Sequence, residues 1–120
     1  MPKYVDGFVV PVPKKNLKNY ARLAKIGCKV WREHGALDFM ECVGDELNLP
    51  FGLSFPKGIR LKKGETVCFS FIVYKSKAHR DRVNRKAMAD PRLTECCDPK
   101  NMPFNPARML VGGFKALVSA

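Results

Sequence analysis

The stretch TVCFSFIVY, residues 66–74, restricts the fold of this chain more than any other feature. It is an almost unbroken run of β-branched and aromatic residues, which is typical of a strand inside a sheet. Side chains on a strand point alternately to the two faces, and here both alternate sets are mostly apolar. We therefore predict a central strand in a sheet that must be covered on both faces.

Three further strands and two helices are predicted around this strand. The strands are expected at 4–12, 36–43 and 108–118, and the helices at 14–34 and 77–90. Pro11 and Pro13 are expected to close the first strand, Gly35 ends the first helix, and Ser76 caps the second helix. The order β-α-β-β-α-β predicts an α+β, ferredoxin-like fold with a four-stranded antiparallel sheet and both helices on one face. A chain of 120 residues is expected to form a single domain over 1–120.

The segments that connect these elements give two more expectations. Residues 44–65 and 90–107 have no periodic pattern and are predicted to be long irregular connections, which often form lids or binding loops. The pair Gly112-Gly113 in the last strand predicts a bulge or a close backbone approach. Ile26 and Val30 widen the apolar surface of the first helix, so we expect a second neighbour on its flank.

The second face of the sheet predicts the oligomeric state. Two helices on one side leave the other apolar face in water, which a soluble domain avoids. The same face of a second copy is the economical cover, because a two-fold dimer matches identical patches. We therefore expect a homodimer formed through the sheet face.

A ligand pocket beside the sheet is the first functional hypothesis. Asp6 is unusual because a carboxylate in the middle of a strand must find hydrogen-bond donors if it is buried. The corner KVWREHGALDFMEC, residues 29–42, brings further polar and aromatic groups near the sheet. The candidate pocket residues are Tyr4, Asp6, Trp31, His34 and Glu41. We expect a small organic ligand, with Asp6 or His34 as a base and Tyr4 or Trp31 positioning a ring, in a cofactor-independent enzyme or a binding protein.

A purely structural interpretation accounts for the same corner. His34 at a helix C-terminus is stabilised by the helix dipole, Trp31 on the apolar stripe is an ordinary core residue, and Glu41 can be solvated. The sequence contains no convergent set of nucleophile, base and orienting group. Catalytic residues, and whether the protein is an enzyme, therefore stay unassigned.

The cysteines predict neither a metal site nor a disulfide framework. There are five of them, without CxxC or Cys/His ligand spacing, and we expect no metal and no cofactor. Cys96 and Cys97 are interpreted as ordinary loop thiols in preference to a soft-metal site or a thiol switch. With reduced thiols, no signal-peptide pattern and no apolar run of about 20 residues, the protein is expected in the cytoplasm with no membrane partner.

RNA binding is the alternative hypothesis. The net charge is +11 and the isoelectric point about 9.7, which suits a polyanionic partner, although the basic residues are spread over nearly the whole chain. Residues 67–74 partly match the RNA-recognition octamer, so Phe69 and Phe71 could stack on bases. The octamer's basic residue and glycine are replaced by Val67 and Cys68. A dimer through the sheet would hide the same two rings, so nucleic acid is the less favoured partner.

Several long segments resemble a known family. They are YVDGFVVPVPKKNLKNY, VWREHGALDFMECV, SFPKGIRLKKGETVCFSFIVYKSKAHRDRVNRKAMADPRL and MPFNPARMLVGGF. Together they resemble the bacterial YbaA-like family of domains of unknown function over nearly the whole chain. The resemblance implies a dimeric α/β barrel, an architecture shared with cofactor-independent monooxygenases, lactone isomerases, haem-handling enzymes and ligand sensors. It implies no reaction and no catalytic residue, and some members carry a name that refers to the signal recognition particle RNA.

Overall fold

The computed structural model describes residues 2–120, which form one four-stranded antiparallel sheet in the order β2-β3-β1-β4. The strands are β1 (Tyr4–Pro13), β2 (Asp38–Val43), β3 (Glu65–Tyr74) and β4 (Leu110–Lys115). β1 and β3 pair along their whole length in the centre, from Tyr4 opposite Tyr74 to Pro13 opposite Glu65. The predicted α+β, ferredoxin-like order with 66–74 as a central strand is confirmed.

The helices include two that the sequence did not predict. They are α1 (Leu17–Glu33), α2 (Phe55–Gly58), α3 (Lys77–Met88) and α4 (Pro91–Cys96), with 3-10 turns η1 (Lys14–Asn16), η2 (Pro99–Asn101) and η3 (Pro106–Arg108). α2 and α4 lie in the two segments that were expected to be irregular. Each begins after a capping side chain, Ser54 or Asp90, and has proline in its first turn. Proline breaks a helix interior but suits a first turn, so the same residues that predict breaks also start these helices.

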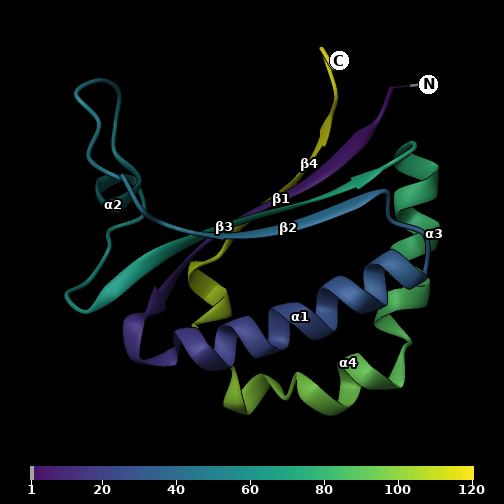
Figure 1. The fold of residues 1–120 in the computed structure, drawn as a ribbon, viewed down its shortest axis with the longest axis horizontal. Helices are drawn as coiled ribbons and strands as arrows, with labels where there is room; N and C mark the ends of the chain where they lie inside the picture. Colours follow the sequence, from purple (N-terminus) through teal and green to yellow (C-terminus); the bar gives the residue numbers. More distant parts are fainter. Residues whose placement is uncertain (1) are drawn as a thin grey trace.

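α1, α3 and α4 lie on one side of the sheet, whereas α2 lies at one end on the other side (Figure 1). α1 runs along this face, α4 packs on α1 farther from the sheet, and α3 stands at one end. Gly35 ends the first helical segment with a φ of 119°, and the Ser76 hydroxyl accepts a hydrogen bond from the His79 amide at 3.2 Å. Leu93 of α4 joins Val30 of α1 in one buried cluster, against which Ile26 packs. The predicted second neighbour on the flank of α1 is therefore α4.

The other face of the sheet is largely uncovered within residues 2–120, because the short α2 lies only at one end of it (Figure 1). It is an apolar surface whose larger side chains, Met40, Phe69, Leu110 and Phe114, are between 43% and 60% exposed. We call this surface the open face. The molecule has extents of 38 × 37 × 20 Å and a radius of gyration of 15.0 Å, against about 14 Å for a compact domain of this length. Figure 1 is viewed down the shortest of these axes and shows the sheet along its edge, so the 20 Å extent runs across the strands. With the main helices on one face, most of the other face of the sheet is left without cover.

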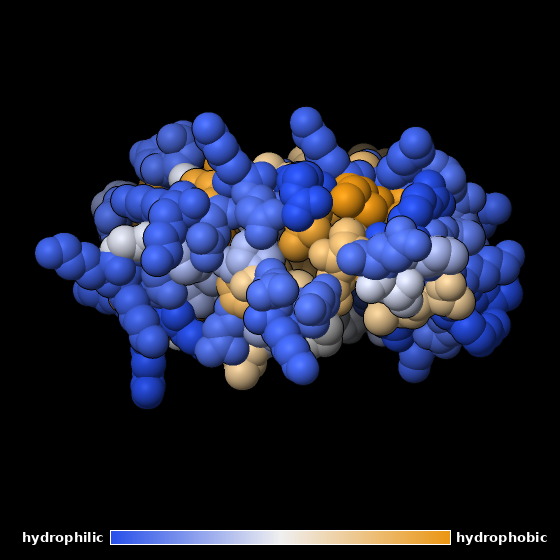
Figure 2. All heavy atoms as spheres, turned by 90° about the horizontal axis from the view of Figure 1, so that it is seen from below, coloured by the Kyte–Doolittle hydropathy of each residue, from blue (hydrophilic) through white to orange (hydrophobic). Residues whose placement is uncertain are grey.

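The helix side has a different surface. Viewed from that side, hydrophilic side chains cover most of the molecule, and apolar atoms are visible in a band between them (Figure 2).

The segment 44–64 leaves the sheet at the end opposite α3 and projects on the open side (Figure 1). No helix among residues 2–120 is both long and apolar enough to cross a bilayer.

The glycines of β4 allow aromatic rings to lie against the backbone. β4 pairs with β1 without interruption from Leu110 to Lys115, so of the two predicted alternatives the bulge at Gly112-Gly113 is absent, whereas a close approach to the backbone is found at Gly113. A Cβ on Gly113 would overlap the Tyr4 ring on the helix side, whereas a Cβ on Gly112 would meet Phe114 at 3.5 Å, an ordinary contact. Gly113 therefore leaves room for the ring of Tyr4.

The two glycines are expected to respond differently to a methyl group. Gly113→Ala must displace the Tyr4 ring and should lower the free energy of unfolding by about 1–3 kcal/mol, the usual cost of overpacking. Gly112→Ala is the matched control and should change it by less than about 1 kcal/mol, because its Cβ fits and the unfolded chain loses freedom. Urea unfolding followed by Trp31 fluorescence measures both. Equal effects of the two variants would contradict this account of Gly113.

Candidate functional site

Within residues 2–120, two cavities lie between α1 and the sheet, one on each flank of the helix. Cavity A has a volume of about 580 Å³ and is closed on its far side by the segment from Met88 to Met109. Cavity B has a volume of about 380 Å³ and lies toward the edge strand β2. Both volumes fall in the range of about 300–1,000 Å³ that is usual for small-molecule sites. Tyr20, Ala24, Phe39 and Glu41 line both cavities, so these four residues lie between the two spaces.

The cavities exist because α1 carries small residues where it crosses the sheet. Ala24 contributes to both walls, and Gly27 faces Phe39 with no side chain between them. α3 stands at the end of the sheet (Figure 1), so it cannot fill the space beside α1. Aromatic and methionine side chains form much of the wall of cavity A, namely Phe8, Trp31, Phe39, Met88, Met102, Phe104 and Met109. The resulting space is mainly apolar.

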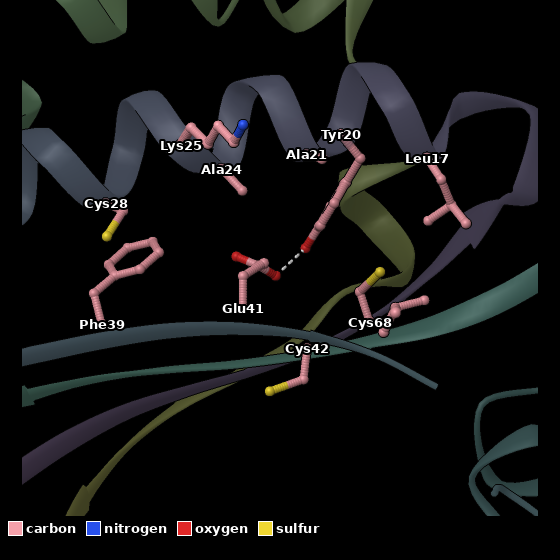
Figure 3. A pocket seen from close by; sticks show the side chains of 11 residues that line it. Leu17, Tyr20, Ala21, Ala24, Lys25, Cys28, Phe39, Glu41, Cys42 and Cys68 are labelled. Atoms are coloured by element: carbon pink, nitrogen blue, oxygen red, sulfur yellow. Dashed lines mark hydrogen bonds between the residues drawn. The ribbon is translucent and has the colours of Figure 1, made fainter. Parts of the chain in front are cut away.

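A carboxyl group stands in this apolar space. Glu41 shares its face of β2 with Phe39, so strand alternation directs it toward α1. The Tyr20 hydroxyl, from α1, donates a hydrogen bond of 2.5 Å to Glu41 Oε1 (Figure 3). Ser70 of β3 lies directly opposite Glu41. A polar pair from a helix and a strand is thus placed between two apolar cavities.

The surroundings shift the protonation of this pair. Burial raises the pKa of Glu41, and the Tyr20 and Ser70 hydroxyls oppose this shift because they stabilise the carboxylate. Burial and the neighbouring Glu41 raise the pKa of Tyr20, and burial raises the pKa of the Cys68 thiol to about 11. Tyr20 and Cys68 therefore stay neutral near pH 7. Glu41 is therefore the group in this part of the site whose ionisation a bound ligand can change.

Asp6 has a structural partner. It is buried on the helix side of β1 and receives a hydrogen bond and an ion pair of 2.7 Å from Arg80 of α3. The Arg80 guanidinium also lies over the Tyr4 ring, 4.8 Å from its centroid, where cation–π attraction adds to the ion pair. Asp6 and Tyr4 are thus brought together, and they hold α3 against the sheet.

Asn84 extends this network toward Trp31. Its side-chain oxygen accepts hydrogen bonds of 2.9 Å from the Trp31 indole and from the Tyr74 hydroxyl. Its nitrogen donates to Asp6 at 3.4 Å. Trp31 is therefore the link between the Asp6 network and the site, because its ring also lines cavity A.

His34 lies in a third place. Its ring forms a hydrogen bond of 2.9 Å with Asp90, which also receives bonds from Arg92 at the start of α4. The Arg92 guanidinium, with help from His34, holds the pKa of Asp90 well below its usual range. His34 lines neither cavity A nor cavity B. Of the five predicted pocket residues, the structure brings Trp31 and Glu41 to cavity A. Tyr4 and Asp6 lie behind Trp31, in the network with Arg80 and Asn84. His34 lies apart from the other four.

The predicted RNA platform lies on the opposite side of the sheet. Phe69 and Phe71 are both on the open face, with ring centroids 6.1 Å apart. Met40 of β2 lies opposite Phe71. Val9 of β1 lies opposite Phe69 on one side and opposite Leu110 of β4 on the other. The immediate neighbours of the two rings are therefore apolar and not basic.

Three residues of these networks were missed from the sequence, namely Tyr20, Arg80 and Asn84. Tyr20 lies on the apolar stripe of α1, so its hydroxyl points at the sheet. Glu41 lies at one of the alternate positions of β2 whose side chains face the core. Those two patterns together could have indicated the pair. Arg80 and Asn84 lie on a polar helix whose sequence has no feature that distinguishes them from solvent-exposed neighbours.

The cysteines are free thiols in the structure. Cys96 and Cys97 have their sulfur atoms 3.1 Å apart, and Cys97 lines cavity A. Among residues 2–120, no group of three or more His, Cys, Asp or Glu side chains is placed to hold a metal ion.

The Asp6 ion pair should contribute strongly to stability. Asp6→Asn removes the buried charge that faces Arg80 and should lower the free energy of unfolding by about 2–3 kcal/mol, since it leaves the largely buried guanidinium with only the half-exposed Asp81 as a charged partner. Asp81 also pairs with Arg80 but is half exposed, so Asp81→Asn is the control and should change stability by less than about 1 kcal/mol. Urea unfolding of both variants tests this, and a loss as small as that of the control would show that the pair is dispensable.

Comparison with known proteins agrees with this fold. A family model described as a protein of unknown function, DUF1428, matches residues 3–106. The chain is 38% identical over 116 residues to the uncharacterized protein YbaA of Escherichia coli, and equally to that of Shigella flexneri, with 97% of each chain covered. Among solved structures, it is similar to a dimeric ferredoxin-like protein from an uncultured marine organism, with a TM-score of 0.61, 10% identity and full coverage of both chains.

Proposed function

Since this chain belongs to the DUF1428 family of proteins of unknown function, we propose a function from its own geometry: it is a homodimer that binds a small, largely apolar organic molecule between α1 and the sheet. The observation that carries the proposal is the Glu41 carboxyl in the wall shared by cavities A and B. An apolar space with one convergent polar group is the usual form of a small-molecule site.

The position of Glu41 favours a binding role over a purely structural one. A carboxyl that serves only stability is usually held by a cation or by several donors, as Asp6 is held by Arg80 and Asn84. The Glu41 carboxyl is stabilised by two neutral hydroxyls, those of Tyr20 and Ser70, and by no cation of residues 2–120, and it stands beside empty space. A carboxyl at this position loses part of its hydration, which costs free energy. A ligand that donates a hydrogen bond to the carboxyl would compensate for that cost.

The open face supports the dimer. Exposed apolar side chains lie on three of its strands, from Met40 on β2 through Phe69 on β3 to Phe114 on β4, and the half-buried Val5 and Val9 of β1 lie between β3 and β4. A second copy with the same face would bury these side chains in an isologous contact. The marine protein of similar fold is described as dimeric, which is consistent with this use of the face.

The two parts of the proposal are compatible in space. The dimer would use the open face, whereas cavities A and B lie on the helix face (Figure 1). Each protomer would therefore keep its own cavities accessible after dimerisation. Phe69 and Phe71 would be buried by the partner and would no longer be available to nucleic acid.

Charges on the open face should break the dimer. The double substitution Phe69→Glu with Phe114→Glu places like charges in an apolar contact and should yield a monomer at low micromolar concentration, because buried unpaired charges are costly. Ala78→Glu on the exposed first turn of α3 is the control and should remain dimeric. Light scattering in low and high salt measures the mass. A wild-type monomer with salt-sensitive affinity for single-stranded RNA would overturn the dimer and favour the RNA platform.

Filling the shared wall should abolish binding of a neutral apolar probe. Ala24→Phe projects a ring into both cavities and should weaken the binding of Nile red at least tenfold, because the ring occupies the space that the dye needs. Ala78→Phe adds the same ring to an exposed site and is the control. Dye fluorescence is titrated against dimeric protein. Equal binding by wild type and both variants would show that the dye does not use these cavities.

A further inference from the structure

We infer that the ligand of the cavity carries one neutral hydroxyl or enol group, which donates a hydrogen bond to Glu41 Oε2. This inference rests on the proposed function, because it requires that the cavities bind a small molecule. It adds the chemical class of that molecule: a ring-shaped, uncharged compound with a single weakly acidic O–H.

The two oxygens of Glu41 have different surroundings. Oε1 accepts the hydrogen bond from Tyr20, and the other oxygen points away from Tyr20 into the space below Ala24 and Lys25 (Figure 3). Among residues 2–120, no side-chain nitrogen or oxygen is both fully buried and without a partner. The Ser70 hydroxyl opposite Glu41 adds to the stabilisation of the carboxylate, and Oε2 is not closed off from the cavity, so it keeps a lone pair for a further donor. A carboxyl oxygen offers lone pairs, which an O–H group fills.

Tyr20 limits what the ligand can be. Its hydroxyl proton is directed at Oε1, so it is not free to donate to a ligand's carbonyl oxygen. The two other hydroxyls in the wall of cavity A are also engaged, because Thr94 donates to the Pro91 carbonyl and Ser70 stabilises the Glu41 carboxylate. The site therefore offers a ligand mainly acceptor capacity, at Oε2. A ligand with a hydroxyl donor matches this capacity, whereas one with only acceptor groups leaves Oε2 unpaired.

The charge balance of the site disfavours ionised ligands. An anionic ligand would meet the Glu41 carboxyl, and the cation nearest to it in the lining, Lys25, is exposed at the outer flank of α1. A cationic ligand would have to lose its hydration in an apolar cavity and approach a protein of net charge +11. A neutral donor avoids both costs.

The remaining wall favours a ring. Trp31 and Phe39 line cavity A with centroids 6.5 Å apart, and Phe8 and Phe104 complete the aromatic surface. Aromatic side chains pack well against flat apolar molecules. A hydroxylated ring can therefore place its flat surface against Trp31 or Phe39 and its O–H on Glu41.

Four probes of one shape separate the alternatives: naphthalene, 2-naphthol, 2-naphthoate and 2-naphthylmethylammonium. Each is used to displace Nile red from the dimeric protein at pH 7. We expect 2-naphthol to bind roughly tenfold to a hundredfold more tightly than naphthalene, the gain expected from a hydrogen bond to a charged group. The two ions should bind more weakly than 2-naphthol.

Variants assign the preference to Glu41. Glu41→Leu should reduce the advantage of 2-naphthol over naphthalene to less than about threefold, while naphthalene still binds. Glu46→Gln removes an exposed carboxyl of the 44–64 segment and is the control, with the advantage unchanged. If Glu41→Leu does not fold, Tyr20→Phe decides: it frees Oε1 while keeping the carboxyl, so the preference for 2-naphthol should persist or increase.

Each outcome has one meaning. Equal binding of naphthalene and 2-naphthol would overturn the hydroxyl inference and leave the proposed apolar site intact. Tightest binding of 2-naphthoate, lost in Lys25→Met, or tightest binding of the ammonium probe would replace the ligand class with an anion or a cation. If no probe displaces the dye and Ala24→Phe does not affect dye binding, the proposed function itself is wrong.

Discussion

The apolar character of the β1–β3 pair on both faces is the constraint on which the rest of this structure depends. The two strands run antiparallel over their whole length in the centre of the sheet, and neither face of them is polar enough for water. The chain places α1, α3 and α4 on one face only, so that face is covered and the other is not (Figure 1). The second face stays apolar and exposed, and burial of such a surface is the largest favourable term available to association. The proposed dimer is a consequence of this imbalance.

On the covered face, the polar network around Asp6 decides where space remains. Arg80 and Asn84 connect α3 to β1, to Trp31 and to Tyr74, so α3 is held at one end of the sheet. α1 is then the main cover for the rest of that face, and its small residues, Ala24 and Gly27, leave cavities on both flanks. Cavity-forming positions lower stability because the lining loses packing contacts. Retaining them beside a carboxyl is easier to explain by a ligand than by packing.

Part of the fold and of the candidate site could be predicted from local pattern. The central strand, the amphipathic first helix, the Ser76 cap and the Gly35 stop follow from residue type and spacing, and the structure confirms them. The segments containing α2 and α4 could not be predicted in this way, because proline and aspartate favour both turns and helix starts. Trp31 and Glu41 were expected near a pocket because both lie in the corner between the first helix and the second strand. His34 satisfies the same pattern, but it meets Asp90, which is 56 residues away along the chain.

The sequence by itself determined the order of elements, the central place of β3 and the need for a second cover, because these depend on periodicity and on the balance of apolar surface. The tertiary structure decided which polar groups meet. Asp6 acquires Arg80 across 74 residues, and Glu41 acquires Tyr20 across 21. Such pairings depend on helix placement and side-chain direction in three dimensions, which spacing along one strand or one helix does not specify. For this reason the sequence indicated a polar group beside the sheet, and only the assembled fold placed Glu41 in the cavity and Asp6 in an ion pair.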